Sequence, residues 1–412
     1  MSLLNSLTVS DLANAIPKHW DAKVRIDAAR KSFWGKFVGK EGSDMPIIER
    51  MDFTKEPGDT INIQIASQLL QEGVTGDTTL EDSEEKFSLA QIQVLPDVLR
   101  HAVATNWKTK KQINFNAIEA IGNMLSSWCA RRLDEDLFLE LVTTHAPSTI
   151  YAGNATNLAA IGPDDTFGTE EIDRIKAALQ RQGALPIRTV MDGKQEIDWY
   201  GIVISEIDEY QLKLDPVWQN ANNNAGPRSY KDNRLFNGAI GCWNGVWVYT
   251  HTAVKYGGRL GSYLRPEAVV YTAAASGDTT LVVGSSASVN YTKFFPASGT
   301  LLIDGEQMSY TGKTFTSFTG LGRGANGTTA AAHAKGALIT LNNVASVIGF
   351  GAEIQARAWG QLPTRITDVR DYGYEQGIGI MAYYGQRTIE DSQGNRPNAI
   401  IMKTYSPNPN SI

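Results

Sequence analysis

The chain has 412 residues, with 38 Lys and Arg against 44 Asp and Glu, so its formal net charge at pH 7 is −6. This length suffices for more than one domain, and the acidic balance argues against a protein that grips nucleic acid through phosphate contacts, which need a basic excess. Cys129 and Cys242 lie far apart and form no CxxC motif, so we expect two buried apolar thiols rather than a disulfide scaffold or zinc ribbon.

Residues 1–57 are predicted to form an N-terminal arm. The pattern is weakly helical, is broken by Pro17, and carries Trp20 and Trp34 as isolated apolar anchors, which indicates a segment that lies on another surface. Asp11 interrupts the apolar start, and no apolar run in the chain approaches the roughly 18 to 20 residues of a membrane span. We therefore expect neither a signal peptide nor a membrane segment.

Residues 58–105 are predicted to form an extended hairpin. The stretches GDTINIQIAS and FSLAQIQVLPDV alternate apolar and polar residues, the period of a half-buried strand, and the connection LLQEGVTGDTTLEDSEEK is polar and acidic. An isolated hairpin is marginal in water and this one has almost no apolar side to bury, so it needs another surface, for which a neighbouring subunit is one candidate. The acidic tip, 81–85, is either a solvated turn or a contact with that partner.

Residues 106–198 are predicted to form a helical domain around a long helix at about 110–144, whose apolar residues recur at steps of three to five. Asp134, Glu135 and Asp136 are consecutive, so they cannot face one another as paired catalytic carboxylates, and with the preceding arginines they indicate a solvated or intersubunit face. A second helix, TEEIDRIKAALQRQG, is expected to begin with Thr169 as its N-cap and to end at Gly183.

The remaining chain divides at two changes in composition. Residues 199–267 open with the buried strand WYGIVIS and continue as short strands and loops, and residues 343–412 carry further strands. Between them, residues 268–342 hold few charges, are crowded with Thr, Ser, Gly and Ala, and repeat short strands such as TTLVVG and GTLLIDG. This composition predicts an all-β module inserted into an α+β chain.

The stretch LGRGANG, residues 321 to 327, matches the dinucleotide-binding pattern GxGxxG letter for letter. The pattern requires a following helix and an acidic residue about twenty positions on, but a strand-like stretch follows instead and no Asp or Glu occurs before Glu353. We therefore interpret Gly322, Gly324 and Gly327 as a glycine-rich turn between strands.

The sequence offers no catalytic or metal-binding constellation. The histidines are isolated in sequence, no HExxH or GxSxG pattern occurs, and neither cysteine carries a nucleophile motif; these histidines are His19, His101, His145, His251 and His333. We predict a non-enzymatic protein with no cofactor and no metal.

The order of arm, long hairpin, spine helix, mixed domain and C-terminal strands resembles the Hong Kong 97 fold of tailed-phage (Caudovirales-type) major capsid proteins. More narrowly, it is similar to the coat-protein branch of coliphage N-four and its relatives. The matching stretches are Gly58-Asp59, Gly73-Val74, Gly76-Asp77, Leu80-Glu81, Glu84-Glu85, Arg100-His101-Ala102-Val103, Leu125, Trp128, Asp136, Asp173-Arg174-Ile175-Lys176, Pro186-Ile187-Arg188, residues 236–241, Gly245-Val246 and Asp371-Tyr372-Gly373. Two departures are Ser205, where the family tends to place a histidine, and the insertion at 268–342.

This resemblance implies an α+β capsid fold with a peripheral domain around the spine helix, an axial domain, and a hairpin lying across the adjacent subunit. It further implies self-assembly through pentamers and hexamers into an icosahedral head that encloses double-stranded DNA without binding it specifically, with scaffolding, portal and decoration proteins as separate partners. The chain would then be a virion component, assembled in the cytoplasm of the bacterial host, and the insertion a surface decoration. The residues expected to make intersubunit contacts are Trp20, Trp34, Gly73, Gly76, Asp77, Leu80, Glu81, Glu84 and Glu85.

A second hypothesis comes from another class of protein. The Thr- and Gly-rich insertion, with Tyr271, Tyr291 and Tyr310, also suits a glycan-binding module on a phage tail or adhesion subunit. Shells that still form without the module would favour the capsid protein, whereas carbohydrate binding and trimers alone would favour the adhesion subunit.

Overall fold

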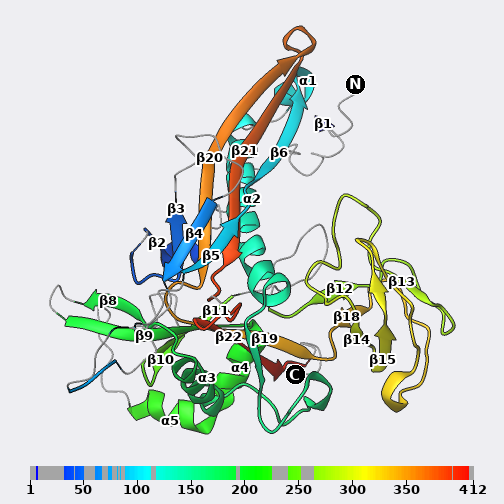
Figure 1. Ribbon diagram of the computed structural model, residues 1–412. Helices are drawn as coiled ribbons and strands as arrows, with labels where there is room; N and C mark the ends of the chain where they lie inside the picture. The colour runs from blue at the N-terminus through cyan, green and yellow to red at the C-terminus, as the bar shows by residue number, and fades with distance from the viewer. Residues whose placement is uncertain are drawn as a thin grey trace. The chain divides into compact units, whose positions relative to one another are not determined.

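The computed structural model describes residues 6–7, 32–40, 42–50, 61–66, 73–76, 81, 84, 89–112, 117–191, 195–224, 240–251, 264–391 and 393–407 (Figure 1). The chain divides into two compact units. The first comprises Met1–Ser43, Ile47–Leu137 and Gln355–Arg387, and the second comprises Asp44–Pro46, Phe138–Ile354 and Thr388–Ile412. Each unit therefore combines stretches that are far apart in the sequence.

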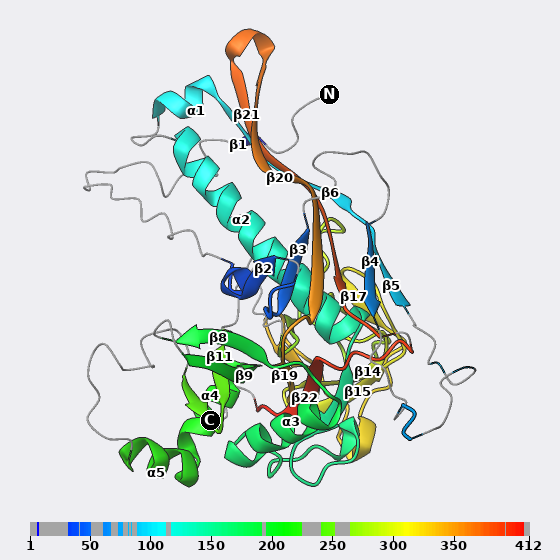
Figure 2. The same ribbon diagram turned by 60° about the vertical axis from the view of Figure 1, so that its left-hand side comes forward.

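The first unit is built on a six-stranded sheet in the order β1-β6-β21-β20-β3-β2. Its strands are β1 (Ser6–Leu7), β2 (Val38–Lys40), β3 (Ile47–Arg50), β6 (Asp97–Asn106), β20 (Gln355–Arg370) and β21 (Glu375–Thr388). Strand β6 runs antiparallel to β21 along its whole length, whereas β3 pairs with β20 only over Gln355–Ala358. The long β20–β21 hairpin closes through a 3₁₀ turn at Asp371–Gly373 (Figure 2).

The spine helix covers this sheet. Helix α1 (Trp107–Gln112) precedes α2 (Ala117–Leu139), which continues into a π-helical turn at Glu140–Thr144. The predicted single helix at about 110–144 thus corresponds to several helical segments. Buried residues recur every fourth position along α2, namely Ile121, Leu125, Cys129, Leu133 and Leu137. This stripe packs on residues of β20 and β21 because such spacing keeps one helix face toward the core.

The predicted hairpin is a separate two-stranded sheet. Strands β4 (Ile61–Ala66) and β5 (Leu89–Val94) pair antiparallel from Ile61 opposite Val94 to Ala66 opposite Leu89. At its base Ile92 and Val94 are buried within the chain, and the backbone of Gly385 comes so close to Leu95 that a Cβ there would lie 2.6 Å from its carbonyl oxygen. The two-stranded hairpin therefore ends at Val94, and the residues from 97 onward belong to the six-stranded sheet of the first unit.

The second unit contains a seven-stranded sheet. Its order is β10-β11-β9-β19-β22-β7, with β8 paired to β9. The strands are β7 (Ser148–Tyr151), β8 (Ile187–Met191), β9 (Gln195–Ile204), β10 (Gly241–Trp243), β11 (Val246–Thr250), β19 (Val344–Phe350) and β22 (Ala399–Tyr405). Every residue of β19 is buried, as expected of a central strand covered on both faces.

Three helices accompany this sheet: α3 (Thr169–Arg181), α4 (Glu206–Leu214) and α5 (Pro216–Asn224). The core joins Ile172, Ile175 and Leu179 of α3 to residues of β9, β19 and β22. Gly349 lets α3 approach β19, because a Cβ at this position would lie only 2.3 Å from the Cγ2 atom of Ile175. The close approach of helix and strand thus requires the absence of a side chain at residue 349.

The start of α3 differs from the sequence expectation, whereas the start of α4 was not predicted. Gly168, not Thr169, is the N-cap of α3, and its N–H donates to Glu171 at 3.1 Å; Thr169 is the first helical residue, and its hydroxyl donates to Asp215 at 2.7 Å. Ser205, the family departure, caps α4 by accepting a hydrogen bond from the backbone N–H of Asp208. A serine is a strong N-cap, so this departure preserves the start of the helix.

The predicted all-β insertion has its own core. Its strands are β12 (Glu267–Val269), β13 (Thr280–Val282), β14 (Gly299–Ile303), β15 (Glu306–Tyr310), β16 (Gly312–Lys313), β17 (Ser317–Thr319) and β18 (Leu338–Thr340). They form a sheet β12-β18-β14-β15 and a sheet β13-β17-β16. Its core cluster of buried residues comes entirely from the stretch between Ala268 and Leu341. Glu267 pairs with Thr340, so the first and last strands of the module lie side by side.

Candidate functional site

The hairpin residues expected at intersubunit contacts are only partly described. Gly73 and Gly76 are exposed at φ of +74° and +73°, a left-handed conformation that favours glycine, and Glu81 and Glu84 are exposed as well. Among the described residues, no heavy atom apart from the chain neighbours lies within 4 Å of a Cβ built at either glycine, so backbone geometry rather than packing calls for glycine there. Contacts of these four residues with another copy of the chain stay a prediction. Trp20, Asp77, Leu80 and Glu85 lie outside the described residues.

Trp34 is fully buried within its own chain. It lies in the 3₁₀ turn Trp34–Phe37 and packs edge-on against Phe33, with ring centroids 5.2 Å apart. Its neighbour Phe37 is buried too, and Lys36 lies over the Phe37 ring at 5.0 Å from the centroid. The indole at this position therefore already has its packing partners inside the first unit.

A buried carboxylate on α2 holds the same turn. Asp134 accepts hydrogen bonds from Ser32 Oγ at 2.5 Å, from the Phe33 N–H at 2.7 Å and from the Trp34 N–H at 3.3 Å. Burial raises the pKa of Asp134, and the three hydrogen bonds oppose that rise because they favour the ionised form. The expectation that Asp134 belongs to a solvated or intersubunit face is wrong for this residue: it points into its own unit.

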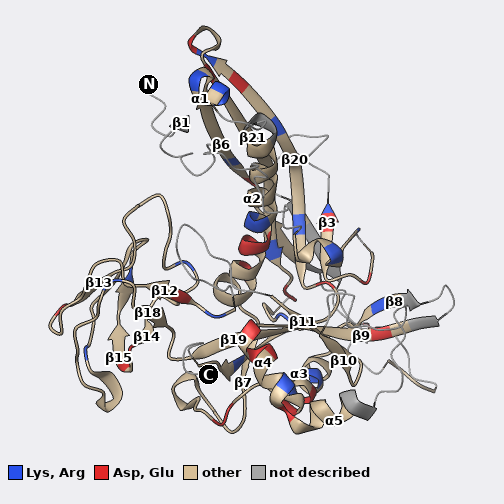
Figure 3. Cartoon of the chain, turned by 180° about the vertical axis from the view of Figure 1, so that it is seen from behind, with Lys and Arg blue, Asp and Glu red and all other residues tan. Residues whose placement is uncertain are grey.

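The charges beside Asp134 pair with one another instead. Arg132 contacts Glu135 at 3.5 Å and Asp136 at 2.9 Å, and the Tyr384 hydroxyl donates to Asp136 at 2.6 Å. Figure 3 shows basic and acidic residues close together along α2. Sequence spacing could not separate Asp134 from its neighbours, because its donors come from residues about a hundred positions earlier.

The distal half of the β20–β21 hairpin is uncovered. Every residue from Leu362 to Arg370 is exposed, although the Arg365 guanidinium lies beside Gly122 of α2. Because successive side chains of a strand point to opposite faces, this stretch exposes side chains on both faces. Leu362, Ile366 and Val369 place apolar surface there, and Tyr372 is fully exposed in the closing turn.

A second apolar surface lies on α4 and α5 of the second unit. Tyr210 and Leu214 are one helical turn apart on α4 and both are exposed, and Val217 at the start of α5 is exposed as well. Residues four apart share a helix face, so Tyr210 and Leu214 form one patch.

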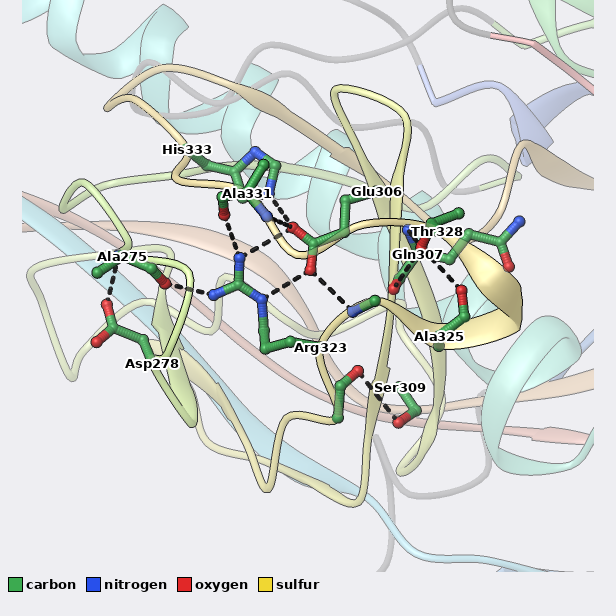
Figure 4. A network of polar contacts seen from close by, with 12 residues as sticks. Ala275, Asp278, Glu306, Gln307, Ser309, Arg323, Ala325, Thr328, Ala331 and His333 are labelled. Carbon is green, nitrogen blue, oxygen red and sulfur yellow. Dashed lines mark hydrogen bonds and ion pairs between the residues drawn. The ribbon is translucent and has the colours of Figure 1, made fainter.

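Inside the inserted module, the LGRGANG stretch, residues 321–327, forms a turn between β17 and β18. Its Arg323 takes part in a buried ion pair (Figure 4). Arg323 donates to both oxygens of Glu306, from Nε at 2.8 Å and from Nη2 at 2.9 Å. The Gly324 and Ala331 N–H groups donate to the same carboxylate at 3.1 and 2.9 Å, and His333 Nε2 lies 2.8 Å from it. These bonds, that of Arg323 foremost, hold the pKa of Glu306 well below its usual range.

The glycines of this stretch serve the ion pair and its turn. Gly324 has a φ of +62°, and a Cβ there would lie 2.8 Å from the Thr328 carbonyl oxygen. Arg323 also donates to the Ala275 carbonyl at 2.5 Å and to the Ala331 carbonyl, so one side chain joins three segments. The glycines of the LGRGANG stretch therefore permit a compact turn beside β15.

A fully buried acid lies in the second unit. Asp208 accepts hydrogen bonds from Ser205 Oγ at 2.7 Å and from Thr404 Oγ1 at 3.0 Å. Burial raises its pKa to about 6, and the hydrogen bonds and Arg265 oppose that rise. Because helix α4 starts at this pair and Thr404 lies on β22, the contact joins the helix to the sheet.

In the part of the chain that the structure describes, no group of three or more His, Cys, Asp and Glu is suited to hold a metal ion. Both cysteines are free thiols; Cys129 is buried as expected, and Cys242 is only half-buried. Within the same ranges, no helix combines the length and apolarity needed to span a membrane.

Several solved phage capsids are similar to nearly the whole chain. The capsid of Ralstonia phage GP4 matches with a TM-score of 0.63 at 17% identity, covering 95% of this chain and 96% of the other. The Cyanophage Pam1 capsid matches with a TM-score of 0.64 at 15% identity, covering 97% of this chain and 98% of the other. The capsid of Helicobacter pylori bacteriophage KHP30 matches with a TM-score of 0.58 at 13% identity, covering 98% of this chain and 100% of the other. These likenesses show an α+β capsid fold of the Hong Kong 97 type, as predicted.

The family follows from the sequence match. The model of the phage capsid protein family matches residues 8–290, well over half of the chain. A search of curated proteins found none that matches the chain. The chain belongs to the phage capsid protein family, and it is a structural major capsid protein of a phage head. The narrower resemblance to the coliphage N-four branch stays a prediction.

Proposed function

We propose that copies of this chain assemble through pentamers and hexamers into an icosahedral head that encloses double-stranded DNA. The role is structural, without a catalytic site, and assembly takes place in the cytoplasm of the bacterial host. Membership of the phage capsid protein family and the similarity to solved phage capsids support this proposal. The net charge of −6 fits a container whose wall does not grip its DNA through a basic surface.

The observation that carries the proposal is the uncovered half of β20. A strand that exposes apolar side chains, and whose edge has no pairing partner among the described residues, is an aggregation hazard in a monomer, and natural proteins cover or blunt such edges. Strand β3 protects β20 only as far as Ala358, and Leu362 to Arg370 stay exposed. A neighbouring copy that covers this stretch would remove the hazard.

The hairpin loop is the second proposed contact. The strands β4 and β5 form a sheet of two strands, which is marginal alone, and Gly73, Gly76, Glu81 and Glu84 in the loop beyond them are exposed. We place these residues against an adjacent copy. Scaffolding, portal and decoration proteins are proposed as separate partners.

The test is assembly of the purified chain, with and without a scaffolding protein, followed by negative-stain microscopy and sedimentation. Val369→Lys puts a charge on the open stretch of β20, where the side chain is 61% exposed, so folding should be unaffected and shells should not form. Phe315→Lys is the matched control, because Phe315 is 55% exposed but lies in the inserted module. Normal shells from Val369→Lys would exclude β20 as the contact, and a wild-type chain that stays a compact monomer in every condition would refute the proposed function.

The inserted module is proposed as a decoration of the shell. Its separate core and its adjacent first and last strands support this reading, since such a unit can be added without disturbing the host domain. The glycan-binding hypothesis drew on the composition of the module and on three tyrosines, of which Tyr310 is buried, Tyr291 packs against the core and Tyr271 is exposed. Shells that still form after deletion of 268–342 would support the decoration role.

A further inference from the structure

The inserted module joins its host sheet through two short connections and not through a long linker. On the entry side the Leu264 carbonyl accepts a hydrogen bond from the Ser346 N–H of β19 at 2.7 Å, and β12 begins at Glu267. On the exit side β18 ends at Thr340 and β19 begins at Val344, so only a turn separates the module from the sheet. Glu267 and Thr340 are paired, which places the two connections side by side.

The exit turn has a backbone conformation that few residue types adopt. Asn342 and Asn343 have φ of +48° and +57°, and asparagine is among the residues that tolerate this left-handed region. The Val344 N–H donates to the Leu341 carbonyl at 2.9 Å, which closes the turn. The Asn343 carbonyl accepts from the Ser406 N–H at 2.6 Å, so the turn is also attached to the segment that follows β22.

The entry connection carries a buried charge. The Arg265 side chain is 1% exposed, and its Nη1 atom lies 2.6 Å from Oε1 of Glu267, whose side chain is 6% exposed. Burial lowers the pKa of Arg265, and three carboxylates oppose that fall, those of Glu267, Glu206 and Asp208. Glu206 and Asp208 lie in the first turn of α4. The guanidinium therefore interacts both with a strand of the module and with a helix of the host domain.

This bridge resists bending of the module. Two connections that lie side by side define a single line, about which the module could still turn. Apolar contacts give little resistance to such a motion because they are non-directional. A buried charge, by contrast, is costly unless it is paired. A bend that separates Glu267 from Arg265, or Arg265 from α4, leaves buried charges uncompensated and is strongly disfavoured.

We propose that Arg265 is a positioning residue that holds the inserted module in one fixed orientation on the seven-stranded sheet. Every copy of the chain then presents the module in the same way, as a rigid projection and not as a tethered one. The inference rests on the proposed decoration role for its purpose and adds a fixed geometry to it. It also assigns Arg265 to the host domain, so that deletion of 268–342 leaves the guanidinium beside the α4 carboxylates.

The test measures the distance between two spin labels on the full-length chain. The labels are attached to Gln180→Cys on α3 and Thr280→Cys on β13, both exposed positions. The background is Cys242→Ser, because Cys242 is half-buried whereas Cys129 is buried and protected from the label. The chain with Arg265 should give one narrow distribution of distances.

Arg265→Met should broaden this distribution. Hydrogen exchange of a peptide covering residues 264–270 should also become about tenfold faster or more, because the buried carboxylates lose their counter-charge. The matched control is Arg188→Met, since Arg188 is 48% exposed and pairs with Asp198 at the surface. Its distribution and its exchange should equal those of the chain with both arginines.

A double variant separates orientation from stability. Arg265→Met combined with Glu267→Gln removes both charges of the closest pair, so it should recover part of the stability lost in Arg265→Met but not the bridge to α4. At a temperature where all chains are folded, its distribution should stay broad, whereas a purely structural role would narrow it again.

A narrow distribution in the double variant or in Arg265→Met, or a broad one in the chain with Arg265, would overturn the proposal. The measurement uses the purified chain, so a chain that forms no shells would refute the proposed function without changing this readout.

Discussion

Replacing Glu306 by Gln removes the charge at the centre of the inserted module while keeping the shape of the side chain. The carboxylate is 1% exposed and holds Arg323, His333 and the N–H groups of Gly324 and Ala331. A glutamine offers one acceptor oxygen instead of two, and it turns an NH₂ group toward donors. The Arg323 guanidinium, 9% exposed, then lacks its counter-charge.

Breaking a buried ion pair by removing one partner costs about 3–5 kcal/mol, because it leaves an uncompensated buried charge. Each backbone N–H left without an acceptor adds about 1–3 kcal/mol, of which the glutamine oxygen recovers part. We therefore expect the Glu306→Gln module to lose about 3–5 kcal/mol of unfolding free energy. Domains typically have about 5–15 kcal/mol in total, so this loss is a large share.

The assay is hydrogen exchange of the intact chain, comparing peptides that cover residues 323–333 with a peptide from α3. Asp304→Asn is the control, because Asp304 contacts the same His333 at 3.1 Å but is 58% exposed, and such pairs contribute about 0–1 kcal/mol. Its φ of +49° also suits asparagine. Exchange rates near 323–333 that rise equally little in both variants would refute the reasoning that Glu306 braces the module.

The ion pair also predicts a dependence on pH. Since the pKa of Glu306 in the folded chain is depressed, its contribution is present above the carboxylate's ordinary range and is lost as the pH falls through and below that range. The stability difference between wild type and Glu306→Gln should therefore persist from pH 5 to pH 8 and narrow in stronger acid. A difference that does not depend on pH would assign the effect to shape instead of charge.

Two further predictions concern the second unit. Asp208 has a pKa raised to about 6, so the folded chain binds a proton that the unfolded chain releases, and stability should fall by roughly 3 kcal/mol as the pH rises from about 4 to about 6. Denaturant unfolding of Asp208→Asn should lack this slope, and an identical slope in both proteins would contradict the assignment. Gly349→Ala should cost about 1–3 kcal/mol, because its Cβ would lie 2.3 Å from Ile175 Cγ2. The cost should shrink when it is combined with Ile175→Ala, and strictly additive losses would show that the two positions are not in contact.

The sequence by itself determined the features that depend on local periodicity. Alternation predicted the ladder of β4 and β5, and apolar residues at helical spacing predicted α2, whose buried face runs from Ile121 to Leu137. The change in composition at 268–342 predicted an inserted all-β module, and buried residues between Ala268 and Leu341 form one core cluster. In each case neighbours along the chain carry the signal, so no tertiary knowledge was needed.

Only the tertiary structure decided which polar residues form buried hydrogen bonds and ion pairs with distant segments. Asp134 and Glu135 are adjacent and look alike in sequence. Asp134 nevertheless caps the turn at residues 32–37, whereas Glu135 pairs with Arg132 on its own helix. Glu306 likewise became an ion-pair centre because folding brings Arg323 beside it. The reason is physical: a carboxylate's role is set by its burial and by donors that arrive from distant segments, and periodicity along the chain carries no record of either.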